Sequence, residues 1–189
     1  MTTWAREALG TALRAVHAVY WDWRLGIRTR WSTAPVAGGK AGDPSAYHVL
    51  LRAAAALRPD EVVVDIGCGS GRACAVFARK CRHVSGIDLS LEAIAIAQRN
   101  GVAASRGDAR TAEYGSATVL WFYNPFGPEA LRSVLRRART PRALYYNASE
   151  AHRDVFPAEG YALDARLEFP GILSAGEDYA VLDYRLTKY

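Results

Sequence analysis

The sequence has few cysteines and almost no lysine, and it has no long run of apolar residues. Its three cysteines (Cys68, Cys74 and Cys81) are an odd number and form no C-x-x-C pair, which argues against a zinc or other metal site and against a disulfide framework. The apolar stretches are interrupted by Arg, Gly or Pro, well short of the roughly 20 residues that a membrane-spanning helix needs. The first ten residues include an acid and no apolar segment, so no secretory signal is predicted. We therefore expect a cytoplasmic protein with buried thiols and no membrane partner.

The 189 residues are half apolar and 23% charged, a composition that predicts one globular domain with one core. The net charge of +5 comes almost entirely from arginine. Five arginines gather late in the chain, at positions 132, 136, 137, 139 and 142. They could contact the phosphates of a nucleic acid, or they could form one solvated helix face, and we favour the second interpretation.

Hydrophobic spacing predicts a helix over residues 3–24 and a second one that ends near Leu57, with Asp43 or Ser45 as its cap. Between them, residues 26–43 are rich in Gly, Pro, Ser and Thr, as in a loop. Beyond Leu57, short apolar strands alternate with helices until two strands follow one another at the end. The predicted strands are residues 61–67, 83–89, 102–108, 117–123, 142–147, 161–169 and 179–188. This order predicts an α/β fold with a mostly parallel sheet and an antiparallel pair at one edge.

The strongest motif is the segment from Val62 to Arg79, in which a buried strand runs through Asp65 into Gly67, Gly69 and Gly71 and then directly into a helix. Glycine allows the chain to turn sharply there, and it lets a ligand approach bare backbone near a helix N-terminus. The dinucleotide fingerprint G-x-G-x-x-G has its third glycine one residue later, so the spacing disfavours an NAD-binding oxidoreductase.

Three more landmarks follow in order: Asp88 at the end of the next strand, Gly107-Asp108-Ala109 after the third, and Asn124-Pro125-Phe126-Gly127 after the fourth. Together with the D-x-G-x-G-x-G turn, they resemble the motifs of the class I S-adenosylmethionine-dependent methyltransferases. The resemblance covers about residues 45–189 and implies a Rossmann-like, seven-stranded sheet with a C-terminal antiparallel hairpin. Residues 1–44 would form an N-terminal helical extension with an aromatic-rich lid segment.

The resemblance implies S-adenosyl-L-methionine as the cofactor, and it assigns roles to particular residues. Asp65 would order the methionine end of the cofactor, and Asp88 would accept hydrogen bonds from both ribose hydroxyls. Leu89 would pack on the adenine face. The full set of implied cofactor contacts is Asp65, Gly67, Gly69, Gly71, Asp88, Leu89, Asp108, Ala109, Asn124 and Tyr47.

Tyr123-Asn124-Pro125-Phe126 also resembles the [DNS]-P-P-[YF] signature of enzymes that methylate amino groups, although it has one proline instead of two. The likeness implies that Asn124 is catalytic and orients the acceptor; the alternative is a turn at the strand end with Phe126 in the core. We expect methyl transfer to an N or O nucleophile of an unidentified acceptor, with a small molecule favoured. The alternatives are a protein or nucleic-acid N-methyltransferase, or a cofactor-binding subunit without catalytic activity.

The N-terminal segment carries five large rings, at Trp4, Tyr20, Trp21, Trp23 and Trp31. They could form a mobile lid over the site or a stripe that packs the first helix on the sheet. The segment also resembles the leader of a widespread group of poorly characterised methyltransferases, which implies that Tyr20, Thr29 and Tyr47 line the site. His48 and His152 could act as bases, but we favour packing for both.

Overall fold

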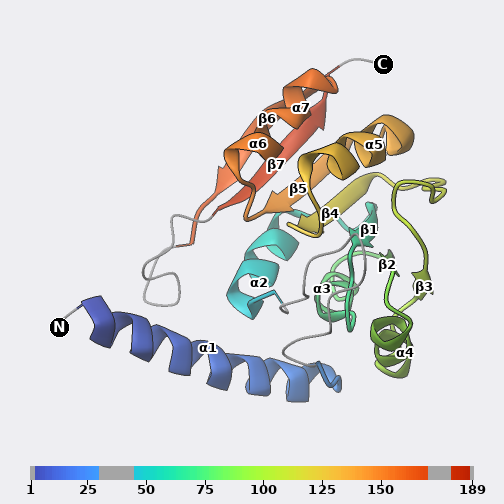
Figure 1. The fold of residues 1–189 in the computed structure, drawn as a ribbon. Helices are drawn as coiled ribbons and strands as arrows, with labels where there is room; N and C mark the ends of the chain where they lie inside the picture. Colours follow the sequence, from blue (N-terminus) through green and yellow to red (C-terminus); the bar gives the residue numbers. More distant parts are fainter. Residues whose placement is uncertain (1–2, 30–44, 170–179, 188–189) are drawn as a thin grey trace.

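The computed structural model describes residues 3–29, 45–169 and 180–187, and of residues 3–7 it describes the backbone alone. These residues form seven helices and seven strands (Figure 1). In chain order they are α1 (Thr3–Leu25), α2 (Tyr47–Ala56), β1 (Val62–Ile66), α3 (Arg72–Phe77), β2 (His83–Asp88), α4 (Leu91–Arg99), β3 (Ala104–Arg106), β4 (Val119–Tyr123), α5 (Pro128–Ala138), β5 (Arg142–Tyr146), α6 (Glu150–Arg153), α7 (Val155–Ala158), β6 (Tyr161–Leu167) and β7 (Val181–Leu186).

All seven strands belong to one sheet, in the order β3-β2-β1-β4-β5-β7-β6. The first five strands are parallel, and β7 is antiparallel to both β5 and β6, between which it lies. The predicted α/β fold with a seven-stranded, mostly parallel sheet and an antiparallel C-terminal pair is confirmed. The carboxyl ends of β1 and β4 are neighbours, since Ile66 pairs with Phe122. Loops that follow parallel strands therefore meet at one edge of the sheet.

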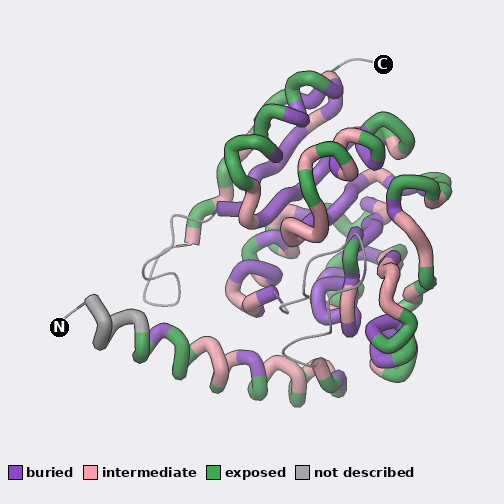
Figure 2. Tube along the Cα trace, in the orientation of Figure 1, coloured by how far each residue is buried: buried purple, intermediate pink, exposed green. Residues whose placement is uncertain are grey.

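The strands are buried on both faces, as a central parallel sheet requires (Figure 2). Alternate residues of β4 point to opposite layers: Val119 and Trp121 pack with α2 and α3, whereas Leu120 and Phe122 pack with α5, α6 and α7. α1 lies outside this sandwich, against α2 (Figure 1). Within the described residues, no helix combines the length and apolar character needed to cross a membrane.

Several local predictions can be compared with the structure. Ser90 caps α4, because its hydroxyl accepts a hydrogen bond from the amide of Ala93 at 3.2 Å. The expectation that Ser45 caps α2 is wrong: the capping position is Ala46, and no described side chain caps this helix, while Asp43 lies outside the described residues. The helical segment between β5 and β6 is divided at Asp154 into α6 and α7. Pro157 lacks the amide that would bond to the carbonyl four residues earlier, which explains the interruption.

The arginine cluster does not form a free basic surface. Arg142 is 2% exposed, and its guanidinium donates to Asp183 at 2.6 and 2.9 Å and to Glu61 at 3.0 Å. The interpretation of Arg142 as part of a solvated helix face is therefore wrong, because it begins β5 and is buried. Three other members of the cluster pair with acids of neighbouring elements: Arg132 and Arg136 with Glu159, and Arg137 with Glu113.

Candidate active site

The glycine turn connects β1 to α3, and all three of its glycines have the positive φ angles that favour glycine: 78° at Gly67, 52° at Gly69 and 86° at Gly71. Two of them also avoid clashes within the protein. A Cβ atom at Gly67 would lie 2.7 Å from Cβ of Pro125, and one at Gly71 would lie 2.8 Å from Cγ2 of Val102. These two glycines are required for packing.

Gly69 differs, because a Cβ atom there would meet no atom of the described residues within 4 Å. The backbone at Gly69 therefore borders open space at the carboxyl edge of the sheet. Its amide donates a hydrogen bond to Oδ2 of Asp88 at 2.9 Å. Of the three glycines, Gly69 is the one whose missing side chain leaves room for a ligand.

Asp88 ends β2 and orders the loops on both sides of it. Its other carboxylate oxygen, Oδ1, accepts from the amide of Ser90 at 2.8 Å, and its carbonyl accepts from the amide of Gly107 at 3.0 Å. Each carboxylate oxygen keeps acceptor capacity beyond its single backbone partner. Asp88 can therefore accept hydrogen bonds from a ligand without releasing the turn.

Asp65 is a buried carboxyl next to the turn, only 3% exposed. Burial raises its pKa to about 7, and the negative charge of Asp88 adds to this effect, whereas a hydrogen bond from the Cys74 thiol at 3.5 Å opposes it. A cation bound nearby would favour the ionised form. Sequence analysis missed a related constraint at Gly86 in β2, where a Cβ atom would lie 2.5 Å from Cβ of Cys68.

The loop after β3 is organised by an ion pair. Arg110 donates from Nε to Asp108 at 3.0 Å, and this hydrogen bond lowers the pKa of the Asp108 carboxyl. Ala109 is buried, and its carbonyl accepts from the hydroxyl of Tyr114 at 2.5 Å. Leu89 follows β2 directly and is half-buried. The sequence thus brings Asp108, Ala109 and Leu89 to the same edge of the sheet as Asp88, through the pairing of β2 with β3.

Asn124 follows β4 with a φ angle of 41°, a left-handed conformation that asparagine tolerates better than most residues. Its side-chain oxygen accepts a long hydrogen bond, 3.4 Å, from the hydroxyl of the buried Tyr145. The next residue, Pro125, lies against Gly67. The Asn124 loop and the glycine turn are therefore in direct contact.

Phe126 and His152 hold the Asn124 loop from the side of the sheet on which α5 and α7 pack. Phe126 is half-buried and packs edge-to-face on Phe122, so its ring belongs to the rim of the core. His152 is 4% exposed; its Nε2–H donates to the Phe126 carbonyl at 2.8 Å, and its Nδ1 shares a hydrogen bond with the Ser149 hydroxyl at 2.6 Å. With both nitrogens engaged, His152 holds the loop in place, which agrees with the packing role favoured from the sequence.

A row of rings continues from the end of β4 towards α2. Tyr123 lies 5.0 Å from Tyr146, Tyr146 lies 6.0 Å from Phe169, and Phe169 lies 5.7 Å from His48, measured between ring centroids. Burial lowers the pKa of His48 to about 4, and its buried Nδ1 has no hydrogen-bond partner within the part of the chain that the structure describes. The rings of this row are tilted or edge-to-face to one another, and they give the carboxyl edge an aromatic border.

Tyr47 makes its contacts behind the glycine turn. It is 2% exposed, its hydroxyl donates to Asp22, and its ring lies 4.7 Å below the guanidinium of Arg72. The predicted contact of Tyr47 with a cofactor therefore stays a prediction, since the structure shows a complete set of contacts within the chain. Tyr20 is exposed on α1, and Trp31 lies outside the described residues.

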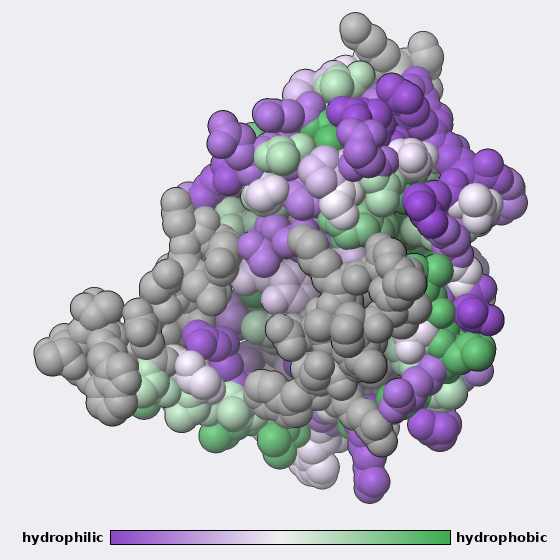
Figure 3. Space-filling model, viewed as in Figure 1, coloured by the Kyte–Doolittle hydropathy of each residue, from purple (hydrophilic) through white to green (hydrophobic). Residues whose placement is uncertain are grey.

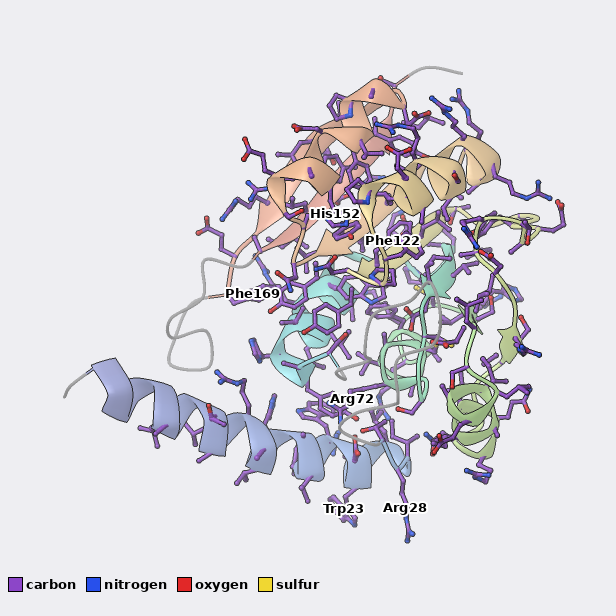
Figure 4. All side chains as sticks on the ribbon, in the orientation of Figure 1. Trp23, Arg28, Arg72, Phe122, His152 and Phe169 are labelled. Atoms are coloured by element: carbon purple, nitrogen blue, oxygen red, sulfur yellow. The ribbon has the colours of Figure 1, made fainter. Side chains whose placement is uncertain are left out.

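Arg72 is the centre of this buried group, and it lies between α3 and the C-terminal part of α1 (Figure 4). Only 5% exposed, it donates from Nε to Thr29 at 3.0 Å and from Nη1 to the Ser45 carbonyl at 3.2 Å. Asp22 lies 3.6 Å from its Nη2 and also accepts from the Thr29 hydroxyl at 2.7 Å. Thr29 is therefore a partner of Arg72, the residue that directly follows the glycine turn.

Asn100 makes a second connection between the same segments. Its side chain accepts from the Arg28 amide at 3.0 Å and donates to the Arg28 carbonyl at 3.1 Å and the Ser70 carbonyl at 3.0 Å. Residues 22–29, which we call the strap, are thus bonded directly to Arg72 and are connected to Ser70 of the turn through Asn100. Sequence analysis did not predict this role for Arg72 or Asn100. The one available signal was a charged residue directly after the third glycine.

Residues 63–140 of the chain match the family model described as "Methyltransferase domain". The matched region begins in β1 and ends before β5, so it contains the glycine turn and the loops of Asp88, Asp108 and Asn124.

Solved structures show the same fold. Thermoplasma acidophilum 1320 superposes with a TM-score of 0.61 over 89% of this chain and 96% of that one, at 20% identity. An RNA methyltransferase from Salinibacter ruber, in complex with S-adenosyl-L-homocysteine, superposes with a TM-score of 0.57 over 77% and 95% of the two chains, at 21% identity. A magnesium protoporphyrin IX methyltransferase from Synechocystis PCC 6803 gives 0.56 over 74% and 76%, at 14% identity.

Among curated proteins, one similar sequence is a probable cobalt-precorrin-6B C(15)-methyltransferase (decarboxylating) from Methanobrevibacter smithii. The two sequences are 33% identical over 55 residues, which is 29% of this chain. The chain spans 29% of that relative's length, so the similarity is local.

Proposed function

We propose that the chain is a class I S-adenosylmethionine-dependent methyltransferase and that it methylates a nitrogen or oxygen nucleophile of a small-molecule acceptor; the match of residues 63–140 to a methyltransferase domain supports this class. The observation that carries this proposal is the contact between the Asn124 loop and the glycine turn, through Pro125 and Gly67. It makes the carboxamide of Asn124 a neighbour of the residues that match the cofactor motif.

The residues of the turn fit S-adenosylmethionine. Gly69 borders open space, and the carboxyl groups of Asp65 and Asp88 end the two strands beside it. When bound, the cofactor supplies an electrophilic methyl group on a positively charged sulfur. We assign Asp88 to the ribose hydroxyls and Asp65 to the charged methionine end, where a cation would hold the carboxyl ionised. Leu89, Asp108 and Ala109 remain the proposed adenine contacts, and Asp108 would bind there while paired with Arg110.

Asn124 is the proposed acceptor-orienting residue. The left-handed backbone of Asn124 and its hydrogen bond with Tyr145 restrict the position of its carboxamide. This supports a role for Asn124 in positioning the acceptor. The aromatic row from Tyr123 to Phe169 supports an acceptor with an apolar part. Four arginines of the cluster already form ion pairs with acids of the protein: Arg132, Arg136, Arg137 and Arg142. Because these cations are paired, a nucleic-acid acceptor is disfavoured.

Calorimetric titration with S-adenosylmethionine, S-adenosylhomocysteine and NAD tests the cofactor. We expect micromolar binding of the first two and none of NAD. Release of S-adenosylhomocysteine is then measured with a panel of small amines and hydroxyl compounds, and with RNA and protein as separate arms. Turnover with RNA or protein alone would contradict the small-molecule proposal. Binding of cofactor with turnover in no arm would support the second candidate, a non-catalytic partner subunit.

The side chain of Asn124 is tested with Asn124→Gly, since glycine adopts a φ of 41° without strain. We expect turnover to fall by about 100-fold, the value of one positioned hydrogen bond in the transition state, with cofactor affinity changed less than a few-fold. Asn124→Ala is the control for backbone strain and should lower the melting temperature in addition. Unchanged turnover in Asn124→Gly would show that Asn124 serves the turn alone.

A further inference from the structure

Helix α1 is apolar on two sides. Its inner side packs on the body of the protein, with Ala18 buried and Trp21 stacked on Tyr47. Its opposite side, which we call the outer face, exposes six large apolar residues: Leu9, Leu13, Val16, Val19, Tyr20 and Trp23. In the described part of the chain, eight large apolar side chains are exposed, and these are six of them. Such a concentration on one helix is typical of a surface that another partner covers.

The outer face points away from the rest of the molecule. Figure 3 shows hydrophobic residues along the lower edge of the molecule, where α1 runs in Figure 1. Figure 4 shows Trp23 directed away from the sheet and from the site around Arg72. Trp23 is 76% exposed, and Val16 and Val19 are 68% and 69% exposed. A partner could therefore contact this face without touching the cofactor turn.

The spacing along the outer face suits another helix. Leu9, Leu13, Val16, Tyr20 and Trp23 follow one another at intervals of four, three, four and three residues. This is the repeat of a helix-pairing seam, in which each apolar side chain enters a gap between residues of the facing helix. Val19 broadens the seam on one side, so the face is wide enough for close packing.

The sizes of these residues favour a particular partner, a second copy of the chain in antiparallel orientation. Pairing about Val16 places Leu9 opposite Trp23 and Leu13 between Val19 and Tyr20, so the large rings near one end of each helix meet leucines near the other end of its partner. A parallel pair would instead bring Trp23 against Trp23 at one end and Leu9 against Leu9 at the other. The antiparallel arrangement is also self-complementary, as the common twofold symmetry of homodimers requires.

Area and charge agree with a second copy. The six side chains present roughly 500 Å² of apolar surface per copy, so a pair buries about 1,000 Å², the lower limit for a specific interface. Of the charged side chains described on α1, Asp22 is bound inward to Tyr47 and Arg72, Arg14 donates to the Thr11 hydroxyl at 3.0 Å, and Arg24 lies 5.8 Å above the Trp21 ring. No charge interrupts the outer face. A lipid-binding helix would instead carry many free Lys and Arg side chains along its border.

We propose that the outer face of α1 is a homodimer interface, in which two α1 helices pair antiparallel about Val16. Each body lies on the far side of its own helix, so the pairing brings the two α1 helices together and keeps both cofactor turns accessible.

Light scattering coupled to size exclusion tests the assembly at about 10–100 µM protein. We expect twice the 20.6 kDa of one chain for the native sequence. Val16→Glu places two like charges at the twofold axis and should weaken association roughly 100-fold or more, leaving a folded monomer. Leu163→Glu is the matched control, since Leu163 is 54% exposed on β6, and it should stay dimeric.

Cysteine cross-linking tests the orientation, because the three native cysteines are buried. Under mild oxidation, Val16→Cys should cross-link with itself. Leu9→Cys and Trp23→Cys should not cross-link alone, but a mixture of the two should. Leu163→Cys measures chance collisions. Cross-linking of Leu9→Cys with itself would overturn the antiparallel arrangement. A monomer at 100 µM would overturn the dimer, and a monomer that sediments with lipid vesicles would assign the face to a lipid surface instead.

Discussion

Gly69 and Gly115 have the same backbone conformation in different surroundings. Both have a φ of 52°, and a Cβ atom at either would meet nothing within 4 Å in the part of the chain that the structure describes. Any substitution therefore introduces the same strain of about 1–2 kcal/mol at both positions. The difference between them is that the space beside Gly69 belongs to the turn that matches the cofactor motif.

We therefore expect Gly69→Ala to weaken binding of S-adenosylmethionine by about 10–100-fold, since an added methyl group in a closely packed site costs about 1–3 kcal/mol. Gly115→Ala should leave the affinity for the cofactor unchanged. Because the backbone strain is the same at both positions, each substitution should lower the free energy of unfolding by about 1–2 kcal/mol. Calorimetric titration and urea denaturation measure the two quantities. Equal affinities in the two variants would remove Gly69 from the binding surface.

At the scale of elements, the strap is the feature that connects the N-terminal region to the site. Asn100 ends α4 and bonds to the backbone of Arg28 and Ser70, and Arg72 bonds to Thr29. The strap therefore restrains the carbonyl of Ser70, which lies between Gly69 and Gly71. Loss of this restraint would free the turn to adopt other conformations, and ligand binding would have to order it again.

We expect Asn100→Ala to reduce cofactor affinity by roughly 3–30-fold, because two to three hydrogen bonds of about 0.5–1.5 kcal/mol each hold the strap to the turn, and part of that loss falls on binding. Gln98→Ala is the control, since Gln98 lies on the same helix and bonds to the Ala104 carbonyl at 2.9 Å without contacting the strap. Calorimetric titration of both variants measures the effect on cofactor affinity, and their melting temperatures measure the effect on stability. If Asn100→Ala lost stability but kept native cofactor affinity, the role of Asn100 would be confined to capping the C-terminus of α4.

The elements themselves were largely predictable, because each is encoded locally. The apolar run of β1, the glycines that follow it and the cap at Ser90 are short-range patterns, and the structure confirms them. The strap was not predictable, since Thr29 and Arg72 are 43 residues apart and Arg28 and Asn100 are 72 apart. Nothing in the pattern near either residue identifies its partner.

The same reason explains the errors. Arg142 was placed with its neighbours in sequence on a helix face, but its partners Glu61 and Asp183 come from distant segments. The hydrogen bond of Tyr47 to Asp22, 25 residues earlier in the chain, was likewise not predictable from the local sequence. Long-range polar pairing inside the core leaves no local signature, whereas the glycine turn does.

At the scale of the molecule, Arg142 connects three parts of the fold. It begins β5 and bonds to Glu61 ahead of β1, to Asp183 in β7 and to the Ala56 carbonyl at the end of α2. Both acids are buried, with 2% and 3% of their surface exposed. Among the described residues, removal of the guanidinium would leave the buried Glu61 with only Arg58, at 3.5 Å, and the buried Asp183 with only Arg185, at 3.8 Å, as countercharges.

We expect Arg142→Met to lower the free energy of unfolding by about 3–5 kcal/mol, the usual cost of breaking a buried ion pair. Arg137→Met is the matched control, because its pair with Glu113 is exposed and should contribute less than about 1 kcal/mol. Urea denaturation measures both changes. The fraction of Arg142→Met molecules that stays folded should bind the cofactor with native affinity. A loss of affinity in this folded fraction would mean that the ion pairs of Arg142 also shape the site.

The position of β7 between β5 and β6 has a consequence for the order in which the chain is made. β5 has its second edge uncovered until β7 pairs with it, and β6 is synthesised before β7. About 35 residues separate the end of β5 from the start of β7, which a ribosome adds in about 2–7 s. During that interval the nascent sheet presents an open strand of five residues, all buried in the finished protein, to neighbouring chains. Folding of this sheet is therefore completed from its C-terminal side, and a chaperone that shields β5 would act in that interval.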